Sequence, residues 1–211
     1  QAANFPFCTI DPNIGVVAVP DYRLLNLAKI SKSKKTINTT ISFVDIAGLV
    51  KGASKGEGLG NKFLSHIREV DAIIHLVRCF ESDKITHVNS KINPVADLET
   101  IKTEIILSDI DIIQKKLEKG KKKLLEEKQI KILEEKLEQL NEGKEIIVKD
   151  GDEKKFLSTL GLLSIKPKII VCNVDEESLA RGNSFTNEVK KKYSSDKVVT
   201  ICADIEDQIM G

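Results

Sequence analysis

The sequence has few cysteines, almost no net charge and no long apolar run. Its four cysteines, Cys8, Cys79, Cys172 and Cys202, are far apart and lack paired metal-ligand spacing, which predicts reduced thiols rather than disulfides or a zinc site. The net charge of +1 gives no reason to expect that the chain as a whole binds nucleic acid or a membrane surface. Without a membrane-length apolar run or a signal-peptide pattern, we expect no membrane partner and a cytoplasmic location.

The composition is that of a globular protein, with 41% hydrophobic and 31% charged residues among 211. Short apolar or β-branched runs alternate with amphipathic segments such as 59–69 and 187–193, which predicts an α/β fold with a doubly wound, mainly parallel sheet. Ligands of such sheets bind beyond the carboxyl ends of the strands, where Asp45, Asn173 and Cys202 lie. The predicted strands are 15–19, 41–45, 72–78, 168–173 and 198–202.

This alternation is interrupted from about residue 97 to residue 160. Asn93, Pro94 and Asp97 supply helix-start chemistry, and Gly120 ends the first predicted helix. On both sides of Gly120, apolar residues recur in steps of three and four. This pattern predicts a coiled-coil hairpin of two helices, each of some twenty residues and about 30 Å long. These residues are Ile106, Ile110, Ile113 and Leu117 in the first helix and Ile130, Leu133, Leu137 and Leu140 in the second.

We therefore predict two domains. Residues 1–96 and 161–211 would form an incomplete nucleotide-binding domain, and residues 97–160 an inserted helical hairpin. Lysines 121–123 lie at the predicted hairpin tip. Such a run is usually a solvated turn, and a local RNA contact is the alternative interpretation.

The most informative motif is Asp45-Ile46-Ala47-Gly48, which closes a predicted strand and opens into a glycine-dense loop. A carboxylate there can hold Mg²⁺ through its water shell, because this ion takes only one or two carboxylates. Gly48 has no Cβ, so its N–H can approach a γ-phosphate oxygen. The whole run from Phe43 to Asn61 predicts a P-loop NTPase of the G-domain type.

This run, together with Asn4-Phe5-Pro6-Phe7-Cys8-Thr9 before it and Arg78-Cys79-Phe80-Glu81 after it, closely resembles the YchF family of Obg-related NTPases. The resemblance covers nearly the whole chain. It implies a nucleotide-dependent molecular switch that hydrolyses ATP, with GTP as a second substrate, and uses Mg²⁺. Because Obg-related proteins commonly associate with ribosomes, it also implies a ribosomal or ribosomal RNA partner. The oligomeric state is not predicted.

The base-recognition element is Asn173-Val174-Asp175-Glu176. Guanine-specific relatives carry Asn-Lys-x-Asp here, and their Asp accepts two hydrogen bonds from guanine. Glu176 is one methylene longer and Val174 replaces the lysine, so we expect a relaxed guanine preference and a preference for ATP. By resemblance, Asn173 faces the base edge, and the backbone of Val174 bonds to the base.

Three further positions take their roles from the resemblance. Thr9 corresponds to the switch threonine that ligates Mg²⁺. Cys202 and Ala203 correspond to the last base-contacting loop, where a backbone N–H reaches the purine. His87 matches a histidine proposed to assist hydrolysis, which matters because Leu49 stands where many GTPases have a water-positioning glutamine.

Two elements of the family are not found in these 211 residues: the phosphate-binding Gly-x-x-x-x-Gly-Lys-Ser/Thr loop and the β-rich TGS domain. This polypeptide as written is therefore expected to bind ATP weakly and to hydrolyse it negligibly. Two hypotheses remain open. The chain is either a portion of an active ATPase switch, or a truncated, nucleotide-dead remnant whose hairpin serves only as an interaction surface. Intact-mass analysis of the native protein separates them.

Overall fold

A computed structural model describes residues 13–46, 59–82, 92–120 and 125–210. The chain divides into two compact units, one within residues 7–48 and the other made of the rest of the chain.

The smaller unit is a two-stranded antiparallel sheet with one helix. Strand β1 (Asn13–Ala18) pairs with β2 (Thr40–Asp45), and the N-cap carboxylate of Asp21 starts the intervening helix α1 (Tyr22–Ser31). The sequence placed these strands in one large sheet with the others. In the structure every residue of β2 pairs with β1, and no third strand joins them among the described residues. Asp45 therefore does not share a described sheet edge with Asn173.

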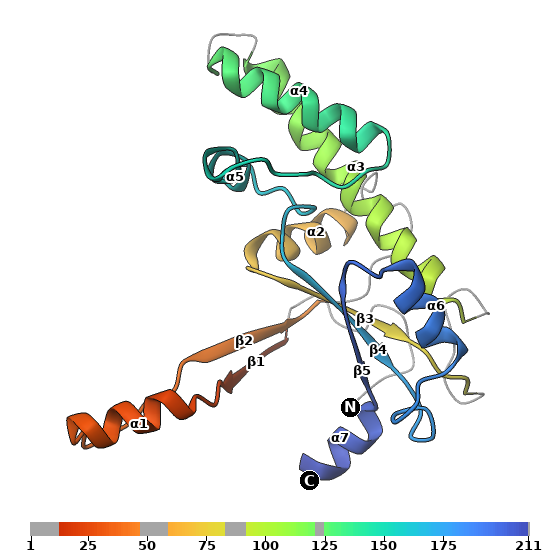
Figure 1. Ribbon diagram of the computed structural model, residues 1–211. Helices are drawn as coiled ribbons and strands as arrows, with labels where there is room; N and C mark the ends of the chain where they lie inside the picture. Colours follow the sequence, from red (N-terminus) through yellow and green to blue (C-terminus); the bar gives the residue numbers. More distant parts are fainter. Residues whose placement is uncertain (1–12, 47–58, 83–91, 121–124, 211) are drawn as a thin grey trace. The chain divides into compact units, whose positions relative to one another are not determined.

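The larger unit is built on a parallel sheet with the order β3-β4-β5 (Figure 1). Its strands are β3 (Ile73–Arg78), β4 (Lys168–Asn173) and β5 (Lys197–Ile201), and helices α2 (Leu59–Glu69), α6 (Ser184–Lys192) and α7 (Ala203–Met210) belong to the same unit. The parallel arrangement predicted from the short apolar runs is confirmed. All three strands end at the same edge, which is the edge where ligands of such sheets bind.

The two faces of this sheet differ in burial. On one face Val77, Ile170 and Cys172 pack with Val189 of α6 in a continuous core. On the other face Ile74 and Leu76 are 48% and 61% exposed. Side chains alternate between the two faces of a strand, so in the described part of this unit the Val77 face of β3 is better covered than the Ile74 face.

The insertion contains three helices: α3 (Pro94–Gly120), α4 (Glu127–Asn141) and α5 (Gly151–Ser158). The Asn93 side chain caps α3 by accepting from the Ala96 N–H at 3.0 Å, as its sequence suggested. Helix α4 is followed by Gly143 in the left-handed conformation (φ 72°). At 27 and 15 residues, α3 and α4 are about 40 and 22 Å long rather than equal.

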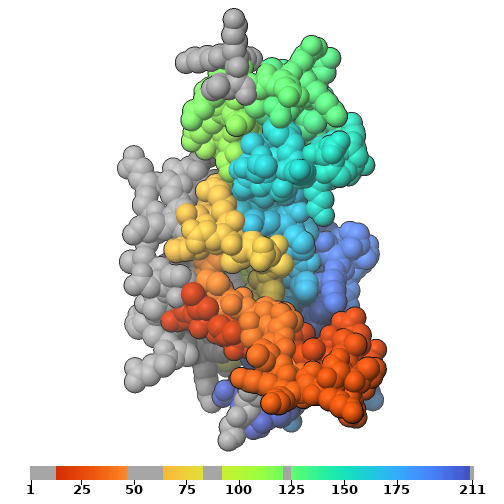
Figure 2. Space-filling model, turned by 90° about the vertical axis from the view of Figure 1, so that its left-hand side faces the viewer, coloured from red at the N-terminus to blue at the C-terminus, as the bar shows by residue number. Residues whose placement is uncertain are grey.

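All eight apolar residues predicted for the hairpin seam lie in one hydrophobic cluster. The cluster also includes Leu157 of α5. In Figure 2 the cyan surface of α5 lies next to the green surface of α4. The insertion is therefore a small three-helix core rather than a two-stranded coiled coil. That residues 97–160 form a separate inserted domain stays a prediction.

A fully buried lysine lies inside this core. The Lys136 ammonium lies 2.6 Å from a Glu153 carboxylate oxygen and donates to the Ile147 carbonyl at 2.7 Å. A buried charge is tolerated only when it is paired and hydrogen-bonded. Lys136 thereby fixes α5 and the segment before it against α4.

The insertion joins the sheet through a buried carboxylate. The side chain of Asp109, on α3, accepts from the Leu163 and Ser164 N–H groups at 2.9 and 2.8 Å. Burial raises the pKa of Asp109, and the hydrogen bonds from Ser164 and Leu163 oppose that rise. This contact holds the segment leading into β4 on α3.

None of the described helices is long and apolar enough to cross a membrane.

Candidate functional site

The candidate site lies at the carboxyl edge of the parallel sheet, where backbone hydrogen bonds continue past the ends of the strands. The Cys79 N–H donates to the Asn173 carbonyl at 2.7 Å, and the Val174 N–H donates to the Ile201 carbonyl at 2.9 Å. The segments that follow β3 and β4 are therefore held against the last residues of β4 and β5. This edge brings together four predicted residues: Asn173, Val174, Cys202 and Ala203.

The side chain of Asn173 bridges two of these segments. Its Oδ1 accepts a hydrogen bond from the Ala203 N–H at 3.0 Å, so the end of β4 is tied to the start of α7. The Nδ2 amide donates to none of the described residues. An amide N–H held in this way is a donor that suits a purine N7, an acceptor that adenine and guanine share.

The next residues divide between core and solvent. Val174 is 3% exposed and belongs to the sheet core, so its side chain is not placed to cover a base as a lysine would. Glu176 is exposed on a turn that the Asp175 carboxylate stabilises by accepting from the Ser178 N–H at 2.8 Å. Because the Val174 N–H is already paired, a base contact through this backbone would use its carbonyl oxygen.

The cysteines at this edge are buried. Cys79 and Cys172 are fully buried, and Cys202 is nearly so; all three are free thiols. A hydrogen bond to Cys172 and burial raise the pKa of the Cys79 thiol, which keeps it protonated. None of the three described cysteines forms a disulfide, which agrees with the reduced thiols expected from the sequence. Cys8 lies outside the described residues.

The phosphate side of the predicted site is described only at Asp45. Its side chain is exposed at the end of β2, in the smaller unit. Thr9, Gly48 and His87 lie outside the described residues. Among the residues that the structure describes, no group of three or more potential metal ligands is found.

Sequence reasoning missed Asn183, which lies close to this edge in the structure. Its Oδ1 accepts from the Thr186 N–H at 3.0 Å and caps α6, and its Nδ2 donates to the Cys79 carbonyl at 2.7 Å. The run Asn183-Ser184-Phe185-Thr186 carries a visible N-cap signal. The second bond spans 104 residues and has no local signal.

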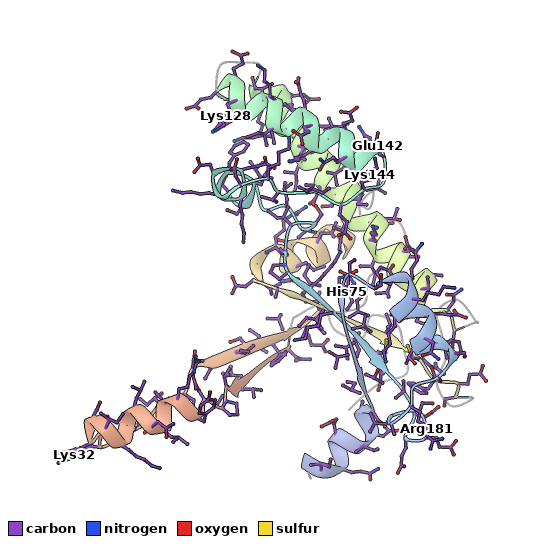
Figure 3. The ribbon with its side chains drawn as sticks, viewed as in Figure 1. Lys32, His75, Lys128, Glu142, Lys144 and Arg181 are labelled. Carbon is purple, nitrogen blue, oxygen red and sulfur yellow. The ribbon has the colours of Figure 1, made fainter. Side chains whose placement is uncertain are left out.

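A cavity of about 40 Å³ lies near the opposite, amino ends of β3 and β4. Ile73, His75 and Lys168 line it, and His75 is labelled in the sheet in Figure 3. Its size corresponds to one or two water molecules, so it is too small for a purine base. Burial lowers the pKa of His75, and its Nε2 has no hydrogen-bond partner in the described parts of the chain. We therefore regard the cavity as structural.

Comparisons with known proteins agree on one family. A family model described as "50S ribosome-binding GTPase" matches residues 1–149. The chain is 43% identical to the "Ribosome-binding ATPase YchF" of Bacillus subtilis and 44% identical to that of Escherichia coli O157:H7, over 99% of this chain and 60% of each relative. The chain thus spans about 60% of the length of these curated relatives.

A solved structure similar to this chain is also a YchF protein. The YchF GTPase of Schizosaccharomyces pombe aligns with a TM-score of 0.77 and 34% sequence identity, covering 98% of this chain and 59% of that one. The α/β P-loop GTPase fold predicted from the motifs is thereby confirmed.

Proposed function

Because this chain belongs to the YchF family and matches the family model of 50S ribosome-binding GTPases, we propose that it carries the base-recognition and switch segments of a nucleotide-hydrolysing molecular switch. The observation that supports this most directly is the bond between Asn173 Oδ1 and the Ala203 N–H. It joins the two expected base-contacting segments at the ligand edge of a parallel sheet. The Asn173 amide is then oriented to donate to a purine.

We propose that the base is adenine in preference to guanine. Guanine selection needs a short, rigid carboxylate facing N1–H and N2–H₂, whereas Glu176 is longer and exposed. The Val174 carbonyl is an acceptor that suits the exocyclic amine of adenine. The relatives' names differ on this point, since two are called ATPases and one a GTPase. Direct competition between ATP and GTP decides it.

On the phosphate side, we propose that Asp45 and Thr9 hold Mg²⁺. A single exposed carboxylate fits this ion, which keeps most of its waters and binds phosphate oxygens. The ion would neutralise charge on the phosphates. Gly48 would offer its N–H to the γ-phosphate, and His87 would assist hydrolysis because Leu49 cannot hydrogen-bond to water.

We propose the ribosome as the partner and the cytoplasm as the location. The bacterial relatives are named ribosome-binding, and lysines 121–123 fall in the sequence between the end of α3 and the start of α4. Replacing all three lysines with glutamate should reduce co-sedimentation with ribosomes at low salt, because the charge reversal opposes contact with RNA phosphates. Unchanged binding would exclude this segment as the contact.

Nucleotide titration of the full-length gene product tests the proposal. ATP should bind in a Mg²⁺-dependent manner, and both Asn173→Ala and Asp45→Ala should weaken it. Histidine substitution separates binding from hydrolysis, because His87→Ala should slow ATP turnover without changing ATP affinity. If wild-type protein binds no nucleotide, the hypothesis of an interaction-only remnant replaces this one.

A further inference from the structure

We propose that Asn183 is a positioning residue for base recognition, a role that rests on the proposed function. It does not touch the expected base-contacting side chains itself. It acts through the backbone of Cys79, which lies between Asn183 and Asn173 in a chain of hydrogen bonds.

The first link is the side-chain amide of Asn183. Its Nδ2 donates to the Cys79 carbonyl at 2.7 Å and to the Ser178 hydroxyl at 3.2 Å. Its Oδ1 meanwhile accepts from the Thr186 N–H. One side chain thus connects the end of β3, the turn after β4 and the start of α6.

The second link is the peptide group of Cys79. Its carbonyl accepts from Asn183, and its own N–H donates to the Asn173 carbonyl at 2.7 Å. Cys79 is fully buried, so a carbonyl deprived of Asn183 has no access to water as a replacement partner. The backbone at residue 79 would then shift, and the Asn173 backbone is bonded directly to it.

The third link is the Asn173 side chain. Its Oδ1 accepts from the Ala203 N–H, which leaves the Nδ2 amide at the base edge. A shift of the Asn173 backbone moves this amide and changes its contact with Ala203. Because hydrogen bonds weaken steeply with misalignment, a displacement here lowers base affinity without altering the phosphate-binding residues.

The chemistry of an amide makes the proposal testable by one substitution. Asn183→Asp keeps an oxygen that caps α6, since Asp and Asn are about equally good N-caps. It removes the donor and places a carboxylate against the Cys79 carbonyl. Helix capping and base positioning, which the native residue combines, are thereby separated.

The experiment measures dissociation constants for ATP and for inorganic tripolyphosphate, which has no base, in the full-length protein. For Asn183→Asp we expect about tenfold weaker ATP binding, the usual cost of losing one hydrogen bond, here the one from the displaced Asn173 amide to the base, and unchanged tripolyphosphate binding. KM for ATP should rise while kcat stays near its wild-type value. Ser178→Ala, which removes only the weaker partner of Nδ2, is the matched control and should bind ATP as wild type does. Asn183→Ser, which is too short to reach Cys79 and adds no charge, serves if the aspartate variant does not fold.

The outcomes separate this inference from the proposed function. If Asn173→Ala weakens ATP binding but the Asn183 variants stay within twofold of wild type, positioning by Asn183 is wrong and the base site stands. If the Asn183 variants weaken ATP and tripolyphosphate equally, their effect is a general loss of structure and the inference is overturned. If Asn173→Ala has no effect on ATP binding, the base site itself is misplaced.

Discussion

The Asn173 side-chain oxygen and the Ala203 backbone N–H form a 3.0 Å hydrogen bond across thirty residues of sequence. The bond fixes which end of the Asn173 amide faces the nearby helix. The donor end is left for a ligand, and the start of α7 is held beside the end of β4. Removing this hydrogen bond should therefore affect both ligand affinity and the order of α7, the last described helix.

Asn173→Ala should weaken ATP binding by about tenfold, because it deletes the expected purine donor and the acceptor for Ala203. Isothermal titration of the full-length protein measures the change. Asn187→Ala, an exposed position on α6, is the control and should leave affinity unchanged. Equal affinities for wild type and Asn173→Ala would contradict the assignment.

Lys136→Met should destabilise the insertion by about 3–5 kcal/mol, because it leaves the buried Glu153 carboxylate without its partner. Urea unfolding followed by circular dichroism measures the loss. Lys131→Met removes an exposed pair with Glu127 and should cost less than about 0.5 kcal/mol.

A double variant tests the cause of this loss. Lys136→Met with Glu153→Gln removes both charges and should recover part of the stability lost in Lys136→Met alone. A double variant that is less stable than the single one would show that the pairing of these two charges does not explain the effect.

His75 should make the larger unit sensitive to mild acid. Burial lowers the pKa of His75, and the Coulomb effect of Lys168 adds to this, while Asp196 and Glu145 oppose it more weakly. Below the ordinary histidine pKa of about 6.5 the unfolded chain binds a proton that the folded chain does not, so stability falls as pH drops through that value.

The variant His75→Leu isolates this effect. The stability of wild type minus that of His75→Leu should fall between pH 7.5 and pH 5, as measured by urea unfolding at each pH. A difference that is constant across this range would show that His75 takes up a proton equally well in both states.

Gly182→Ala should destabilise more than Gly143→Ala. Both glycines have a left-handed φ near 70°, which alone costs an alanine about 1 kcal/mol. A Cβ at Gly182 would also lie 2.6 Å from the Thr186 hydroxyl oxygen, whereas one at Gly143 meets open space. We expect an extra loss of at least about 1 kcal/mol at position 182, measured by thermal unfolding. Equal losses would mean that the α6 cap adapts without strain.

The parts of the fold that the sequence predicted are those with local signals. Strands β3, β4 and β5 are short apolar runs, and the apolar residues that pack α3 against α4 recur every three or four residues. Composition and spacing are therefore enough to predict these elements. Antiparallel pairing of β1 with β2 in a separate unit carries no such signal. Neither does the burial of Lys136, because a lysine within a charged helix ordinarily faces solvent.

The sequence likewise predicted only part of the candidate site, namely its residues and not their hydrogen-bond partners. The motif around Asn173 predicted which residues lie at the sheet edge. It did not predict that the Val174 and Ala203 N–H groups are already paired within the protein. It also gave no indication that Asn183 reaches Cys79, because tertiary hydrogen bonds between distant segments depend on the packing of α6 against the sheet.

Competition between ATP and GTP for the full-length protein, compared in wild type and Asn173→Ala, is the most direct test of the central claim that this chain carries an adenine-preferring base site. We predict that wild type binds ATP more tightly than GTP and that Asn173→Ala weakens both, since both purines present N7. Tighter GTP binding, or no response of either nucleotide to the substitution, would contradict the account.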